Sequence, residues 1–370
     1  MMSRTERKVA FISATTLLFS TLEFLIPKPL PFLRLGLANL PLLIILPIVD
    51  FKTYLAVLLL KVIGQGMVSG TLFSYLILIS LAGTFTSGVA MYATKRVLKD
   101  RVSLLGCSLI GAFVSNLSQL AVAALIVYGK SIWIAAPLML GLGLVSSFGL
   151  GVLAEYFWRK SSAVAHLADD SLDLGIPYLA EREHAKLASL TALLSIIAII
   201  ASRNLLPLIG ITLLMFGMQA ACRRKIRIGP PLMLISSLII VSFLEPNGKV
   251  LMTFGKFVLT ETALEVALIK ALRLISLIAA SQCLVRSNPP LRGSIGRALL
   301  LTLAYFNLLT TSYTERSGKL LERVDQALIE SAAGTRVLSV AQPKSINTAM
   351  VLLSGIAVIA LSLISRFALI

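Results

Sequence analysis

Long apolar runs separated by short polar joints restrict this chain to very few folds. Six of them fill the N-terminal part, at about 9–27, 36–49, 51–68, 71–94, 103–128 and 132–158. Each is close to the roughly 20 residues that a helix needs to cross a bilayer, or is short enough to require a tilt or a kink. Because a chain in lipid must satisfy its own backbone hydrogen bonds, such runs favour helices. We therefore expect an all-α, polytopic membrane protein.

The pattern resumes after a polar, acidic interruption at residues 161–186. Further apolar runs follow at about 187–202, 204–222, 230–244, 263–285 and 345–364. Residues 249–262 look amphipathic, and we expect them at the outer surface. The sequence thus predicts about six plus five transmembrane helices in two modules, residues 1–160 and 187–370, joined by a cytoplasmic linker.

The basic residues indicate the orientation of the chain. The protein is 57% hydrophobic and 14% charged, yet its formal net charge is +17. With the N-terminus inside, the inner loops of the first module hold ten Lys and Arg residues and the outer loops hold three. This distribution follows the positive-inside rule, so the charge needs no nucleic acid to explain it. We expect a multi-pass protein of the cell membrane with a cytoplasmic N-terminus.

Residues 286–344 form a long stretch without a membrane-length apolar run. Within it, 292–307 and 313–329 carry apolar residues at helical spacing and leave charged residues on the other side. Two amphipathic helices are therefore predicted at the cytoplasmic surface, within about 290–340. They are either an interfacial hairpin packed on its own bundle or elements that transmit contact from a soluble partner.

The sequence carries no recognisable catalytic or metal-binding motif. It has no phosphate-binding loop, no Asp-rich pair for a magnesium-bound diphosphate and no His/Cys cluster. Cys107, Cys222 and Cys283 lie inside apolar runs without paired spacing. His166 and His184 match no common ligand pattern. We expect a non-catalytic chain with no metal or cofactor of its own.

Several polar residues lie within or beside the spans of the first module. These candidate substrate-binding residues are Glu23, Arg34, Asn39, Lys61, Gln65, Asn116 and Gln119. Most fall in the outer halves of the predicted helices, where ionisable groups are costly and usually face a cavity or each other. A small polar pocket that opens outward is one interpretation. In the alternative, Glu23 pairs with Lys61 or Arg34 to hold helices together. The side-chain amides of Asn116 and Gln119 then form hydrogen bonds to neighbouring helices.

The first module resembles a known family. The resemblance rests on Glu23, Pro27, the segment RLGLAN at 34–39 and KVIGQGMVSGTLFSYL at 61–76, and it extends over about residues 5–160. The family is the Gx transporter or heptaprenyl diphosphate synthase component I family. It is similar to the substrate-binding S components of energy-coupling factor transporters.

The second module resembles the transmembrane T component of the same transporters, of the cobalt-transport permease type. The resemblance covers about residues 187–365 and is strongest at LTETALEVALIKALRLISLIAASQCLV, residues 259–285. It implies that the amphipathic helices are coupling helices, which in that family end in Ala-Arg-Gly and contact an ATPase through the arginine. This sequence has only remnants of that motif, at residues 315–318 and 332–336. The resemblance therefore implies that Arg316 and Arg336 contact the ATPases.

Ala10 and Ala14 form a small-xxx-small pair on one face of the first predicted span. Such a pair lets another helix approach closely in lipid. S components use this pattern to contact the T component, so the resemblance implies an intermodule contact. Close packing within the first module would use the same two residues.

The two resemblances together imply a fused S and T subunit of an energy-coupling factor importer. It would take up a vitamin-like or other small precursor molecule, with two separate ABC-type ATPases consuming ATP and magnesium. The alternative is a membrane accessory subunit of heptaprenyl diphosphate synthesis. The sequence does not identify the substrate.

Overall fold

The computed structural model describes most of the chain. It covers residues 3–25, 36–69, 71–171, 174–177, 186–202, 204–222, 235–236, 239, 248–254, 257–286, 293–318, 320–332 and 347–367. Arg34, Arg336 and most of the predicted span at 230–244 lie outside these residues, so the expectations that rest on them stay predictions.

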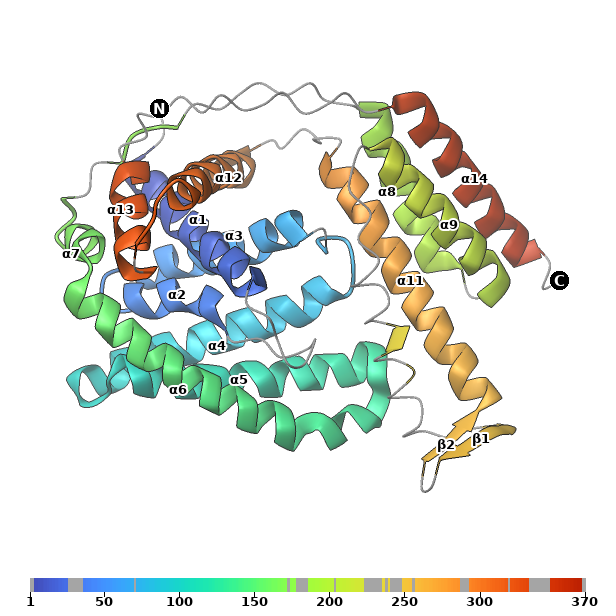
Figure 1. Cartoon of the computed structure of the whole chain (residues 1–370), viewed down its shortest axis with the longest axis horizontal. Coiled ribbons are helices and arrows are strands. Elements are labelled where there is room, and N and C mark those ends of the chain that lie inside the picture. Colours follow the sequence, from blue (N-terminus) through green and yellow to red (C-terminus); the bar gives the residue numbers. More distant parts are fainter. Residues whose placement is uncertain are drawn as a thin grey trace.

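The N-terminal module is helical throughout its described residues. Its elements are α1 (Arg4–Leu25), η1 (Leu37–Asn39), α2 (Leu40–Ile45), α3 (Phe51–Ser69), α4 (Leu76–Leu98), η2 (Lys99–Arg101), α5 (Leu104–Ala123), η3 (Ala124–Tyr128), η4 (Gly129–Ala135) and α6 (Ala136–Lys160). Helices α3 to α6 pack in chain order, and α1 lies on α3 (Figure 1). Four described stretches are long and apolar enough to cross a membrane: Phe51–Ser69, Leu76–Arg101, Leu104–Ile126 and Ile132–Lys160.

The prediction of a span at residues 36–49 is wrong. Helix α2 has only six residues, which is about 9 Å of helix, whereas the apolar core of a bilayer is about 30 Å thick. Gly36 has a left-handed φ of 81°, and Pro41, which lacks an N–H, lies in the first turn of α2. All six residues of α2 are buried, so this run is apolar because it fills the core.

Close helix contacts in the N-terminal module depend on glycine. A Cβ atom added to Gly151 of α6 would lie 2.6 Å from the Cα atom of Leu105 in α5, closer than real Cβ atoms approach a backbone. On α4, a Cβ atom at Gly88 would lie 2.5 Å from a side-chain carbon of Leu58. These positions let the helix backbones approach where lipid gives no hydrophobic drive for association.

The C-terminal module contains a group of four described helices. They are α8 (Lys186–Ala201), α9 (Leu205–Ala221), α11 (Glu261–Arg286) and α14 (Thr348–Phe367). Both α11 and α14 pack on α8 and α9. Three shorter apolar helices fall in this group, Lys186–Ala201, Leu205–Ala221 and Thr348–Ile364. The predicted total of six plus five spans is therefore not confirmed by the described residues.

Residues 249–262, which the sequence predicts to be amphipathic and at the outer surface, include the described strands. They form a β-hairpin, in which β1 (Val250–Phe254) pairs antiparallel with β2 (Phe257–Thr260). The strand sequences VLMTF and FVLT explain the pairing, because they are rich in β-branched and aromatic residues. Among the described residues, the regular structure is thus helical apart from this hairpin.

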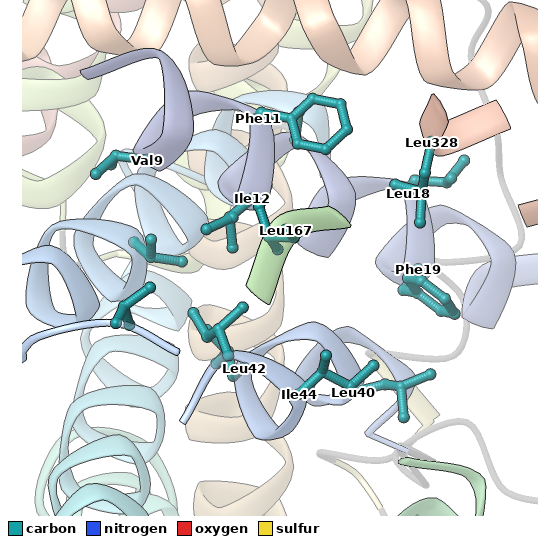
Figure 2. Packing of buried hydrophobic residues seen from close by; sticks show 14 of the residues in the cluster. Val9, Phe11, Ile12, Leu18, Phe19, Leu40, Leu42, Ile44, Leu167 and Leu328 are labelled. Carbon is teal, nitrogen blue, oxygen red and sulfur yellow. The ribbon is translucent and has the colours of Figure 1, made fainter. Parts of the chain in front are cut away.

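Helices lie at both places where the sequence predicts amphipathic helices, α12 (Gly293–Thr314) and α13 (Leu320–Ala332), and their role in coupling stays a prediction. The main contacts of α12 are with α1, α13 and α3. One continuous core holds Leu299 and Tyr305 of α12, Leu328 of α13 and the buried face of α1. Figure 2 shows Leu328 close to Leu18 of α1 within this core. The hairpin therefore packs on the other module of the chain.

The two groups of long helices lie crosswise (Figure 1). Helices α8 and α14 begin at the top of the view and α11 ends there, whereas the turn from α3 to α4 points sideways toward α11. At that contact the Phe73 N–H donates to Ser281 Oγ at 3.3 Å, and Gln282 Nε2 donates to the Ser69 carbonyl at 3.5 Å. The turn between α3 and α4 thus lies near the C-terminal end of α11.

Replacement of Gly151 by Ala should lower the free energy of unfolding by about 1–3 kcal/mol, because the added methyl group must push the Leu105 backbone away. The matched control is Gly149→Ala on the same helix, where nothing lies within 4 Å of the added atom. Thermal unfolding in detergent measures both. Equal melting temperatures for the two variants would contradict this account of the α5–α6 contact.

Candidate functional site

A buried polar pair lies where the chain breaks between α1 and α3. Asn39 ends the 3₁₀ turn η1, and its side-chain oxygen accepts a hydrogen bond from Lys61 Nζ of α3. Lys61 is only 3% exposed. A buried ammonium group requires such a partner, so the short η1–α2 element places an oxygen where the α3 cation needs one.

Two more candidate residues lie on the same elements. Glu23 stands near the end of α1, which packs on α3, and it is 6% exposed. Gln65 follows Lys61 by one helical turn of α3 and is half-buried. Arg34 is outside the described residues. The structure therefore brings Asn39 and Lys61 into contact and keeps Glu23 and Gln65 on neighbouring helices.

The amides of α5 are engaged within the helical bundle. Asn116 Nδ2 donates to the Met139 carbonyl of α6 at 3.1 Å. Gln119 Nε2 donates to Ser115 Oγ one turn earlier, at 2.8 Å. A Cβ atom at Gly83 of α4 would lie 2.4 Å from that amide nitrogen, so Gln119 fills the space that this glycine leaves. Asn116 thus bonds across to α6, whereas the hydrogen bond of Gln119 stays within α5 and only its packing reaches α4.

Arg316 also has partners within the chain. Its guanidinium group forms an ion pair with Glu330 of α13, at 2.7 Å between Nη2 and Oε2, and it donates to Gln326. Arg323 of α13 stacks on the ring of Tyr313 of α12, 4.2 Å from the ring centroid, and donates to the Tyr313 carbonyl. These contacts hold α12 and α13 together. Arg336 is outside the described residues.

Ala10 and Ala14 have no exposed surface. They belong to α1, in which every residue from Val9 to Phe19 is buried. Beside them, Phe11 makes an edge-on ring contact with Tyr305 of α12, with centroids 5.4 Å apart. The helix that carries the small-residue pair is thus the helix that contacts α12.

Within the described part of the chain, no group of three or more His, Cys, Asp or Glu residues could hold a metal ion. Cys107, Cys222 and Cys283 are buried free thiols. A surface hollow on α4, lined by Phe85, Thr86, Val89 and Ala90, includes none of the candidate residues.

The sequence did not reveal two residues that join distant parts of the chain. Asp325 of α13 accepts hydrogen bonds from the start of α7 (Ser162–Ala168), and the Tyr305 hydroxyl donates to the Gly175 carbonyl. A serine before an apolar stretch, such as Ser161, is a recognisable N-cap signal. No local sequence pattern could predict that its partner is Asp325, 164 positions away.

Comparison with known families covers the N-terminal module. Residues 12–157 match the family described as heptaprenyl diphosphate synthase component I. The match agrees with the resemblance of the first module and includes less than half of the 370-residue chain. No curated protein and no solved structure matches the chain. The C-terminal module thus has no counterpart in these comparisons.

If Lys61 contacts a substrate, as the sequence predicts, its replacement by Met should weaken binding by about 1–3 kcal/mol, because it removes a buried charged donor beside Asn39. Asn116→Ala, which breaks a contact between α5 and α6, should instead lower thermal stability and leave binding intact. Mass spectrometry of the small molecules that copurify with the whole chain measures the first effect. Full ligand recovery from folded Lys61→Met would remove Lys61 from the site.

Proposed function

We propose that this chain is a membrane component of an energy-coupling factor importer, with a substrate-binding and an energy-coupling module fused in one polypeptide. The observation that carries the proposal is the packing of α12 and α13 on α1. Residues 12–157, which include most of α1, are the part that matches a family. The α12–α13 hairpin belongs to the C-terminal module but packs on α1 of the N-terminal module. A movement of the hairpin would therefore also move the N-terminal module.

Energy would come from two separate ABC-type ATPases, since the sequence offers no phosphate-binding loop. ATP and magnesium then belong to those partner chains. The sides of α12 and α13 that face away from α1 are the surface proposed for docking them. Ile295, Arg297, Glu322 and Ile329 are exposed there.

The crosswise arrangement supports transport by reorientation. The α3–α4 turn contacts α11 near the C-terminal end of that helix, and the N-terminal group of helices lies across the group of α8, α9, α11 and α14 (Figure 1). In this arrangement the two groups of helices cannot both stand upright in one bilayer. We propose that the N-terminal module collects substrate upright and lies across the membrane to release it inside.

The match of residues 12–157 to the heptaprenyl diphosphate synthase component I family favours a second candidate, a membrane accessory of heptaprenyl diphosphate synthesis. Purification of the tagged chain from its own cells discriminates between the two. Copurification of two ATPases supports the importer, whereas copurification of a soluble prenyl transferase supports the accessory role. A saturable small ligand on the N-terminal module would also favour the importer.

If Arg316 itself contacts an ATPase, Arg316→Ala should abolish ATPase copurification. The ion pair with Glu330 provides a matched control, because Glu330→Gln breaks the same pair and keeps the positive charge. We expect the ATPases to remain bound to Glu330→Gln. Loss in both variants would show that the pair acts by shaping the α12–α13 hairpin, and retention in both would place docking elsewhere.

Replacement of Ala10 and Ala14 together by Leu should block uptake while the ligand still binds. The larger side chains need space that fully buried positions lack, and overpacking of this kind costs about 1–3 kcal/mol. The control is Ala93→Leu on α4, at an exposed position. Normal uptake by the double variant, or loss of its ligand, would show that this face does not couple the modules.

A further inference from the structure

The segment between the two modules is more than a tether. Its described residues are 161–171 and 174–177, and we call them the latch. Ala163, Val164 and Leu167 of α7 are buried, as is Leu174. All four belong to the core that contains α1 and α12, and Figure 2 labels Leu167 of α7 and Ile12 of α1 among the residues of this core. A polar, acidic stretch of sequence thus supplies apolar side chains to the main core.

Asp325 of α13 anchors the first end of the latch. Its carboxylate accepts hydrogen bonds from the N–H groups of Ser162 at 3.2 Å and Ala163 at 3.0 Å. It also accepts from both serine hydroxyls, of Ser161 and of Ser162. A carboxylate at the start of a helix is favourable because the free N–H groups there carry partial positive charge.

The second end of the latch is fixed at Gly175. Its N–H donates to the Ala332 carbonyl at the end of α13, at 2.8 Å. Its carbonyl accepts from the Tyr305 hydroxyl of α12. One residue therefore bonds to both helices of the hairpin.

Basic residues at the start of α1 also bind the latch. Lys8 donates to the Asp170 carboxylate at 3.0 Å, and Arg4 lies 3.5 Å from it. The hydrogen bond from Lys8 is the main reason that the pKa of Asp170 is lowered below its usual value. Arg7 donates to the Leu174 carbonyl at 2.5 Å. The latch is thus bonded to α1, to α12 and to α13.

We propose that the latch locks the N-terminal module onto the α12–α13 hairpin, so that the two halves remain one unit and no other substrate-binding module can replace the first. A flexible tether alone would only raise the local concentration of one module near the other. The latch adds specific bonds, which a free competitor that lacks residues 161–177 could not form. The locking of the two halves rests on contacts within the chain alone, whereas the exclusion of other substrate-binding modules rests on the proposed importer function.

The test measures exchange of halves in the folded protein. A protease site inserted between residues 178 and 185 leaves the latch on the N-terminal half. Two purified preparations, with different tags on each of their halves, are cleaved and mixed, and newly paired tags are followed over time. We expect slow exchange for the cleaved protein and at least about tenfold faster exchange for Asp325→Ala, since even one lost bond to a charged group has about that effect.

Glu322→Ala is the matched control, because Glu322 is an exposed carboxylate on the same helix. It should exchange as slowly as the parent protein. Asp325→Asn, which keeps the shape of the side chain, should exchange at an intermediate rate, and Tyr305→Phe should also accelerate exchange. Melting temperatures confirm that each variant is folded. Rapid exchange in the parent, or equal rates for folded Asp325→Ala and Glu322→Ala, would overturn the proposal.

Discussion

The packing of α1 against α12 is the contact on which the arrangement of the two modules depends. Phe11 and Tyr305 meet edge-on at its centre, a geometry worth about 0.5–1.5 kcal/mol beyond the apolar area buried. Because α1 also packs on α3, one buried helix lies between the N-terminal bundle and the hairpin of the other module. Movement of α12 therefore cannot leave the N-terminal bundle unaffected.

Much of the helical fold could be predicted from local pattern. The runs that became α3, α4, α5 and α6 are long and apolar, and the spacing of apolar residues predicted α12 and α13. The failures lie where composition alone is ambiguous. An apolar run is the same whether lipid or protein surrounds it, so α2 was mistaken for a span, and 250–260 was read without its strand pairing.

Less of the candidate site could be predicted. Polar residues inside apolar runs can be recognised in a sequence, because their burial costs free energy unless they have a partner. Asn39 and Lys61 are two such residues, and the fold brings them together. Sequence reasoning could not separate them from Asn116 and Gln119, whose contacts depend on glycines in neighbouring helices. Nor could it find Asp325, because a carboxylate on an amphipathic helix looks solvated until the serines it binds are placed beside it.

If the module reorients as proposed, bilayer thickness becomes a variable of the mechanism. Val97 on α4, Leu125 on η3 and Val145 on α6 are more than 70% exposed, and apolar side chains of this kind favour contact with lipid. The apolar height that a bundle presents to the membrane changes when it turns on its side. Hydrophobic mismatch costs fractions of a kcal/mol per Å, so bilayer thickness would shift the balance between the upright and the tilted state. Lipid composition would then tune the balance between the two states without contacting any binding residue.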